Sequence, residues 1–272
     1  MATHILTRSD GGAVRFFLTL SYRGAPFHGW QVQPGAVSVQ EVIEDALMKL
    51  TGSRVAVTGA GRTDAGVNAR MMVAHADIPP VNMSADALLR GLNALCGPDI
   101  AVHSVTPVHS DAHARFDATS RTYRYYATER KSPFIHWLSW QCGSRLDFEA
   151  MNAAAATLPD VSDFASFAKL HSDARTTLCH VSRACWIPVD HLPGAWYFEI
   201  TADRFLRNMV RAVVGTLVEV GRGKLSLDGF RRVVEARDRC AAGTSMPPQA
   251  LYLWDVGYPY FDANTATYTP II

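Results

Sequence analysis

Apolar residues follow two different periods in the first part of the chain. Residues 14–22 are apolar at every second position from Val14 to Tyr22, which is typical of a β-strand with one buried face. Residues 39–50 instead place their apolar side chains on one helical face. Ser38 and Glu41 have the spacing of a capping box, in which each side chain accepts a hydrogen bond from the other residue's backbone N–H. The pattern therefore predicts a strand followed by a helix.

The same periods predict the elements up to residue 108. Short strands are expected at 54–58, 70–77 and 100–108, and a second helix is expected to begin after Ser84. Together with the first two elements, these give the order β-α-β-β-α-β. That order is the split βαβ, or ferredoxin-like, arrangement.

A similar but looser order continues toward the C-terminus. Strands are expected at 121–128, 180–188 and 196–202, and helices at 148–158, 204–220 and 226–238. No close sequence repeat is visible, so the duplication is inferred from element order alone. We predict an α+β fold of two ferredoxin-like halves whose sheets join around a central cleft.

The predicted boundary between the halves falls near Ala118. Residues 1–13 are polar and contain glycine, and we expect them to form a flexible N-terminal tail. The N-terminal half is then 14–118 and carries a glycine-rich loop with an acid. The C-terminal half is 119–272 and carries a tyrosine-rich strand and several arginines.

Composition narrows the class of protein. The chain has 272 residues, of which 48% are hydrophobic and 19% charged, as in ordinary globular proteins. No apolar run approaches the roughly 20 residues of a membrane helix, and the N-terminus lacks a signal-peptide layout, so we expect a cytoplasmic protein. A formal charge of +1 means that any RNA site must come from local clusters of arginine. The five cysteines are scattered without a C-x-x-C motif, which favours buried free thiols over a zinc site.

The loop at 57–70, VTGAGRTDAGVNAR, is the most informative segment. A dinucleotide fingerprint would need glycine at Asp64 and a helix afterwards, where we expect a strand. The nearest candidate for a phosphate loop, at 221–225, has Leu225 where serine or threonine is required. What remains is the Asp64 carboxylate among flexible glycines, two residues from Arg62. A nearby arginine favours the ionised carboxylate that a nucleophile requires. The alternative is a turn aspartate that bonds its own backbone and pairs with Arg62 for stability.

Six segments in the same order resemble one family. They are FHGWQVQ at 27–33, GRTDAGV at 61–67, RFDATSRTYRYY at 115–126, DFASF at 163–167, FLRNMVRAVVGTL at 205–217 and PPQALYL at 247–253. Together they cover about 230 residues and resemble the TruA family of tRNA pseudouridine synthases. The resemblance implies that Asp64 is the nucleophile, with Arg62 as its neighbour in the site. It also implies that Tyr123 is the active-site tyrosine, able to stack the base, and that Arg211 pairs with the aspartate.

Two positions depart from the family pattern. Asn68 stands where histidine usually follows Gly-Val, and Ala250 stands where glycine is usual in PPQALYL. Both put the fine loop geometry in question more than the reaction. Leu251, in the same block as Ala250, is expected to contact the substrate.

Arginines supply the local positive charge. With a helix at 204–220, Arg204, Arg207 and Arg211 would share one face, and we expect Arg207 to touch phosphate. Arg115, Arg121 and Arg124 form a second group that could line the cleft and hold phosphates, although such stripes are more often merely solvated. His109 and His113 have an i, i+4 spacing, but their strand-like context argues against a metal.

The implied reaction needs no cofactor. Pseudouridine formation breaks the N-glycosidic bond, turns the base and rejoins it through C5. The resemblance implies action on tRNA positions 38–40 in the anticodon stem-loop, and a homodimer that shares one tRNA. From the residues themselves we expect neither a metal nor a membrane partner. Whether Asp64 attacks C6 of the base or C1′ of the sugar stays open. The alternative classes are a non-catalytic RNA-binding protein with the same fold and, less favoured, a nucleotide-binding enzyme.

Overall fold

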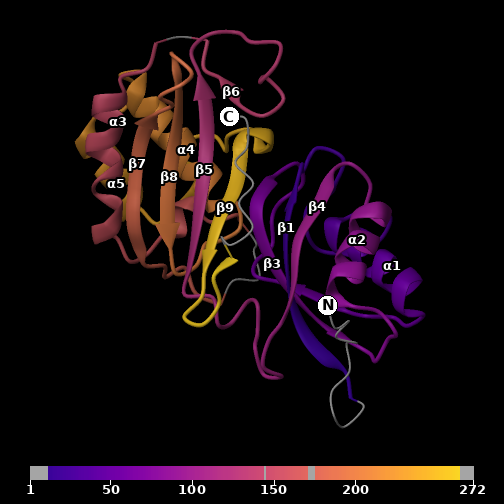
Figure 1. The fold of residues 1–272 in the computed structure, drawn as a ribbon. Helices are drawn as coiled ribbons and strands as arrows, with labels where there is room; N and C mark the ends of the chain where they lie inside the picture. The colour runs from indigo at the N-terminus through magenta and orange to yellow at the C-terminus, as the bar shows by residue number, and fades with distance from the viewer. Residues whose placement is uncertain (1–11, 144, 171–174, 264–272) are drawn as a thin grey trace. The chain divides into compact units, whose positions relative to one another are not determined.

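The computed structural model describes residues 12–143, 145–170 and 175–263. Residues 1–11 of the predicted N-terminal tail lie outside this range. The described part contains nine β-strands and five α-helices in a mixed α+β arrangement (Figure 1). It divides into two compact units: residues up to Thr119 together with those from Leu253 onward form unit 1, and Ser120–Tyr252 form unit 2. We use these two names below.

Unit 1 has the predicted element order. Its elements are β1 (Val14–Tyr22), α1 (Val39–Thr51), β2 (Val57–Gly59), β3 (Asn68–Ile78), α2 (Ala85–Leu95) and β4 (Ile100–Pro107). β1 lies between β4 and β3, antiparallel to both, and β2 pairs with β3. The division between the units falls within β9 (Leu251–Gly257), which neighbours β3 in the sheet. The sequence pattern did not predict β9.

Both predicted helix starts in unit 1 are confirmed. Ser38 Oγ accepts from the Glu41 N–H at 3.2 Å, and Glu41 Oε2 accepts from the Ser38 N–H at 3.4 Å, which completes the capping box of α1. Ser84 caps α2 by accepting from the Ala87 N–H at 3.2 Å. Because caps satisfy backbone donors that a helix leaves unpaired, these local signals can be read directly from sequence.

Unit 2 is built on three long antiparallel strands. Its elements are β5 (Ser120–Thr128), β6 (Trp140–Gln141), α3 (Phe148–Ala155), β7 (Val181–Pro188), β8 (Ala195–Ala202), α4 (Met209–Gly221) and α5 (Leu227–Glu235). β8 lies between β5 and β7, and the short β6 runs parallel to β5. Ser226 caps α5 as predicted, by accepting from the Gly229 N–H at 3.1 Å.

The predicted helix at 204–220 is wrong at its start. α4 begins only at Met209, because Asn208 has a left-handed φ of 67° that interrupts the helix. The Asn208 side chain donates to Ser245 Oγ at 2.6 Å, a contact 37 residues away that the local pattern could not reveal. Arg204 and Arg207 therefore precede the helix and do not share a helical face with Arg211.

α4 is almost entirely buried within unit 2, and its close packing depends on a glycine. A Cβ atom added to Gly215 would collide with the carbonyl oxygen of Thr244. The backbone of residues 243–246 can therefore lie directly against α4. This packing fixes the position of the residues at the start of the helix.

None of the five cysteines forms a disulfide. Cys96, Cys142 and Cys179 are buried, whereas Cys240 is exposed. Burial raises the pKa of Cys96 and of Cys179 to about 11, so these thiols stay protonated. Among the helices of the described residues, none is long and apolar enough to cross a membrane.

Candidate active site

Asp64 lies in the loop of residues 60–67 between β2 and β3, as predicted. The Val67 N–H donates to the Asp64 carbonyl oxygen at 3.1 Å, which closes a four-residue turn from Asp64 to Val67. Gly66 occupies the third position of this turn with a φ of 78°, a conformation that favours glycine. The Asp64 residue is half-buried, whereas Arg62 is exposed. The expected pairing of these two side chains stays a prediction.

A second segment of unit 1 binds the loop on both sides of Asp64. The Trp30 N–H donates to the Thr63 carbonyl oxygen at 3.2 Å. The Gly66 N–H donates to the Phe27 carbonyl oxygen at 3.3 Å. Residues 27–30, FHGW in the sequence, thus hold the backbone immediately before and shortly after Asp64. We call residues 27–30 the brace.

The brace can approach this closely because of Gly29. Its φ is 90°, and a Cβ atom there would collide with the Thr63 carbonyl oxygen. Any other residue at position 29 would push the brace away from the loop and strain the backbone. The sequence analysis identified the FHGWQVQ block but could not say which segment it contacts, since the two blocks are about 30 residues apart.

Buried side chains support the loop from within unit 1. The hydroxyl groups of Tyr22 and Thr63 share a hydrogen bond of 2.8 Å. Asn68 Oδ1 accepts from the Gly24 N–H at 2.8 Å, and Asn68 is 3% exposed. Asn68, which stands where the family usually has histidine, therefore has a structural role. Its amide oxygen is the acceptor that the buried Gly24 N–H requires.

Tyr123 lies on β5 in unit 2, opposite Ile200 of β8. Its ring is half-buried and meets the edge of Phe205, with ring centroids 5.0 Å apart and planes at 83°. Tyr125 is two residues farther along the same strand and is completely buried. Its hydroxyl has no hydrogen-bond partner among the described residues. Burial raises the pKa of Tyr125 far above its ordinary value, and the nearby charge of Arg211 opposes this only in part.

Arg211, at the start of α4, is bonded to the backbone of Met246. Its Nε donates to the Met246 carbonyl oxygen at 2.5 Å, and the Met246 N–H donates to the Arg211 carbonyl oxygen at 3.1 Å. Met246 acts through its backbone alone, so its residue type gave no sequence signal. The contact fixes the guanidinium through its Nε–H group.

Comparison with known proteins identifies the family. A family model described as tRNA pseudouridine synthase matches residues 20–117 and 154–259. The chain belongs to the tRNA pseudouridine synthase family. A protein of Parabacteroides distasonis named tRNA pseudouridine synthase A is 54% identical over 245 residues, covering 90% of this chain and 96% of that protein. Proteins of the same name from Porphyromonas gingivalis, 53% identical, and Geobacter sulfurreducens, 41% identical, cover 97% and 98% of their own lengths and 90% and 89% of this chain.

Solved structures are more distant. A Cbf5-Nop10-Gar1 complex matches with a TM-score of 0.35 and 10% identity, over 80% of this chain and 52% of that one. A likeness with so low a TM-score and identity supports no conclusion about this chain. Asp64 lies in the first matched stretch of the family model and Arg211 in the second, whereas Tyr123 lies between the two.

The remaining predicted site residues of this tRNA pseudouridine synthase differ in accessibility. Arg207 is exposed, and its carbonyl oxygen accepts from the Lys169 N–H at 3.0 Å. Leu251 is only 5% exposed at the start of β9. Ala250 is fully buried in a 3-10 turn (Pro248–Ala250) and has no positive φ, so the turn accepts an alanine where the family usually has glycine.

Arg121 and Arg124, two of the three arginines of the expected second group, have separate partners in unit 2. Arg124 makes an ion pair with the largely buried Glu199, at 2.7 Å, and lies over the ring of Tyr197. Arg121 donates to the Asp203 carbonyl oxygen at 2.8 Å. Since neighbouring strand residues point to opposite faces, Arg121 and Arg124 lie on opposite sides of β5. They therefore do not line one surface together.

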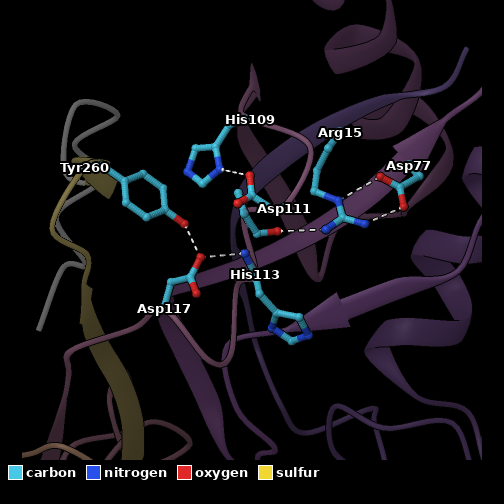
Figure 2. A network of polar contacts seen from close by, with 8 residues as sticks. Arg15, Asp77, His109, Asp111, His113, Asp117 and Tyr260 are labelled. Carbon is cyan, nitrogen blue, oxygen red and sulfur yellow. Dashed lines mark hydrogen bonds and ion pairs between the residues drawn. The ribbon is translucent and has the colours of Figure 1, made fainter.

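Figure 2 shows contacts of the two spaced histidines in unit 1, His109 with Asp111 and the His113 backbone N–H with Asp117. His109 Nδ1 contacts Asp111 at 2.6 Å, whereas His113 Nδ1 accepts from the N–H groups of Arg115 and Phe116 at 3.1 and 3.2 Å. The two rings thus have separate partners. In the described part of the chain, no cluster of three or more histidine, cysteine or acidic residues could hold a metal.

Proposed function

We propose that this enzyme converts uridines of the tRNA anticodon stem-loop to pseudouridine, with Asp64 as the nucleophile and without a cofactor. The observation that carries the proposal is the brace. Asp64 is half-buried in a glycine-rich loop, and the backbone on both sides of it is held by hydrogen bonds from residues 27–30. A rigidly placed carboxylate is what a nucleophile requires, since small displacements of a reacting group slow the chemical step.

The reaction is an isomerisation, so its atoms balance within the nucleotide. The N1–C1′ bond breaks, the base turns, and a C5–C1′ bond forms. The proton on C5 is then lost to an acceptor, and N1 gains a proton. Asp64 would form a transient covalent bond either with C6 of the base or with C1′ of the sugar. Both routes release the carboxylate unchanged at the end.

We assign the other residues by resemblance and by their surroundings. Tyr123 is proposed to stack the target base and to accept the C5 proton, and its half-buried ring is already oriented by Phe205. Arg211, fixed by Met246, is proposed to pair with the Asp64 carboxylate. The exposed Arg62 is proposed to fill the gap that a flipped uridine leaves in the RNA.

Substrate contacts and assembly complete the proposal. Arg207 is proposed to bind phosphate and Leu251 to contact the substrate near the target base. We propose that the two halves of the chain are ferredoxin-like, which the β-α-β-β-α-β order of unit 1 supports. We further propose a cytoplasmic homodimer that shares one tRNA.

The test is product mapping on unmodified tRNA. The purified protein is incubated with an unmodified transcript, and pseudouridines are mapped by their chemical reactivity. We expect product at one or more of tRNA positions 38–40. A matched transcript with cytidine at these positions should yield none there. Binding of tRNA without any pseudouridine would instead favour the alternative of a non-catalytic RNA-binding protein.

A further inference from the structure

A basic and aromatic surface segment follows β5 in unit 2. Residues 130–137 have the sequence RKSPFIHW, and we call them the RW segment. Phe134 is 86% exposed and Trp137 is 68% exposed, which makes them two of the most exposed large apolar side chains in the described structure. Exposed aromatic residues side by side on one short segment indicate an interaction surface rather than a packing role.

The RW segment is nevertheless held in a defined conformation. The His136 N–H donates to the Ser132 carbonyl oxygen at 3.2 Å, and the Leu138 N–H donates to the Ile135 carbonyl oxygen at 2.9 Å. The buried Tyr252 hydroxyl donates to the Leu138 carbonyl oxygen at 3.0 Å. These bonds attach the segment to the body of unit 2.

The Trp137 indole has a ring contact within the segment, tilted by 44°. The ring of His136 lies against it, with centroids 4.0 Å apart. The indole is thereby presented to solvent as a supported aromatic surface. Because its exposed area is apolar and flat, a further planar group can stack on it.

The sequence in and after the RW segment carries a positive charge. Residues 130–146 contain no acidic residue, and they include Arg130, Lys131 and Arg145. Arg130 and Lys131 are both exposed, immediately before the aromatic residues. Glu129 and Asp147 flank the stretch, so the positive charge is confined to it. A protein with a net charge of only +1 therefore has a distinct cationic patch here.

We infer that the RW segment is a second contact surface for the tRNA substrate, which stacks unpaired bases on Trp137 and Phe134 while Arg130 and Lys131 bind phosphates. Proteins bind single-stranded nucleic acid by this combination of aromatic platforms and cationic side chains. Surfaces between protein copies are also rich in aromatic residues and arginine, but they are depleted in lysine, which this segment has at Lys131. The inference rests on the proposed function for the identity of the RNA.

The RW segment is separate from the proposed catalytic residues of unit 2. Glu129 is six positions after Tyr123 along the chain, which corresponds to about 20 Å in extended conformation at roughly 3.3 Å per residue. The segment also lies between the two stretches, 20–117 and 154–259, that the family model matches. A contact at this distance would reach nucleotides away from the target uridine and add affinity without taking part in the chemistry.

The test separates tRNA affinity from the chemical step. Trp137→Ala and Phe134→Ala should each weaken tRNA binding by roughly 5- to 30-fold, as expected for the loss of one stacked base. The single-turnover rate at saturating tRNA should stay at the wild-type value. Trp137→Phe keeps an aromatic ring and should retain most of the affinity. Leu178→Ala, which truncates another exposed apolar side chain of unit 2, is the matched control and should change neither quantity.

Salt dependence distinguishes the two kinds of contact. Arg130→Gln and Lys131→Gln should each reduce the slope of the logarithm of affinity against that of salt concentration by about one. The aromatic variants should leave this slope unchanged, because stacking releases no counterions.

Three results would overturn the inference. Wild-type affinity in both alanine variants would exclude stacking on this surface. A change of sedimentation in Trp137→Ala without a loss of affinity would make the surface a contact between copies of this chain. Loss of the single-turnover rate with unchanged affinity would place the segment in the chemistry instead. If wild-type protein binds tRNA but makes no pseudouridine, the proposed function fails, and the affinity comparison still tests this surface.

Discussion

Arg211 and Met246 are bonded to each other twice, once through the Arg211 side chain and once through its carbonyl oxygen. This pairing orients a guanidinium at the first turn of α4 through the backbone of Met246. Arg207, four residues earlier, lies before the helix and is exposed. The two arginines, which the sequence pattern placed on one helical face, are therefore expected to do different things.

Replacement of each arginine should separate these roles. Arg211→Lys loses the planar Nε–H that Met246 accepts, so we expect a fall of tenfold or more in the single-turnover rate and only a small change in tRNA affinity. Arg207→Ala should weaken binding and reduce its salt dependence by about one phosphate contact. Equal losses of affinity in both variants, with unchanged rates, would refute the distinction.

The Tyr123 hydroxyl is predicted to accept a proton. Tyr123→Phe retains the ring, so it should bind tRNA normally but stall before the proton on C5 is lost. Tritium placed at uridine C5 gives the measurement, because it enters water only when the new C5–C1′ bond is complete. Wild-type protein should release it, and the phenylalanine variant should release it very slowly. Release at the wild-type rate would leave Tyr123 as a stacking residue only.

Two buried tyrosines of unit 2 allow the contribution of a hydroxyl group to stability to be compared with and without a hydrogen bond. The Tyr125 hydroxyl has no hydrogen-bond partner among the described residues, whereas the Tyr252 hydroxyl donates to Leu138. Tyr125→Phe should therefore leave the free energy of unfolding unchanged or increase it slightly. Tyr252→Phe should lower it by about 1–3 kcal/mol, since the Leu138 carbonyl loses its donor. Denaturant unfolding measures both, and a larger loss for Tyr125→Phe would show that its hydroxyl has a stabilising partner.

The stability of unit 1 should fall in mild acid. Burial lowers the pKa of His75 to about 4, and the charges of His113 and Arg15 act in the same direction against the smaller opposing effects of Asp77 and Asp117. His75 Nδ1 accepts from the buried Ala114 N–H at 3.1 Å, a bond that requires the neutral ring.

The direction in which stability changes with pH follows from the lowered pKa of His75. The unfolded chain binds the proton near pH 6.5 and the folded chain only near pH 4, so stability is complete above pH 6.5 and is lost as the pH falls toward 4. Between pH 7 and 5 we expect a loss of about 1–2 kcal/mol attributable to this residue. His75→Asn keeps an acceptor but cannot titrate, and its unfolding free energy should depend less on pH over this range. Identical pH profiles would exclude His75 as the source.

Local signals made much of the fold predictable. The Ser38–Glu41 capping box and the Ser84 and Ser226 caps act within a few residues, and all were confirmed. The strand predicted from the alternation at 14–22 was also confirmed, but residues 16–20 are buried on both faces of the strand. The start of α4 was wrong because Asn208 is held by Ser245, far along the chain. The candidate catalytic loop could be identified from its residue types, but its brace could not. The bonds of Trp30 and Phe27 to the loop are made by backbone atoms, which any sequence possesses.

The most direct test of the account is the single-turnover rate of Asp64→Asn on unmodified tRNA, measured beside its tRNA affinity. The amide has the shape of the carboxylate but is not a nucleophile, and the backbone bonds that hold the loop remain. We predict that no pseudouridine forms above the uncatalysed level, while affinity stays within a few-fold of wild type. Conversion at a substantial fraction of the wild-type rate would contradict the assignment of Asp64 as the nucleophile.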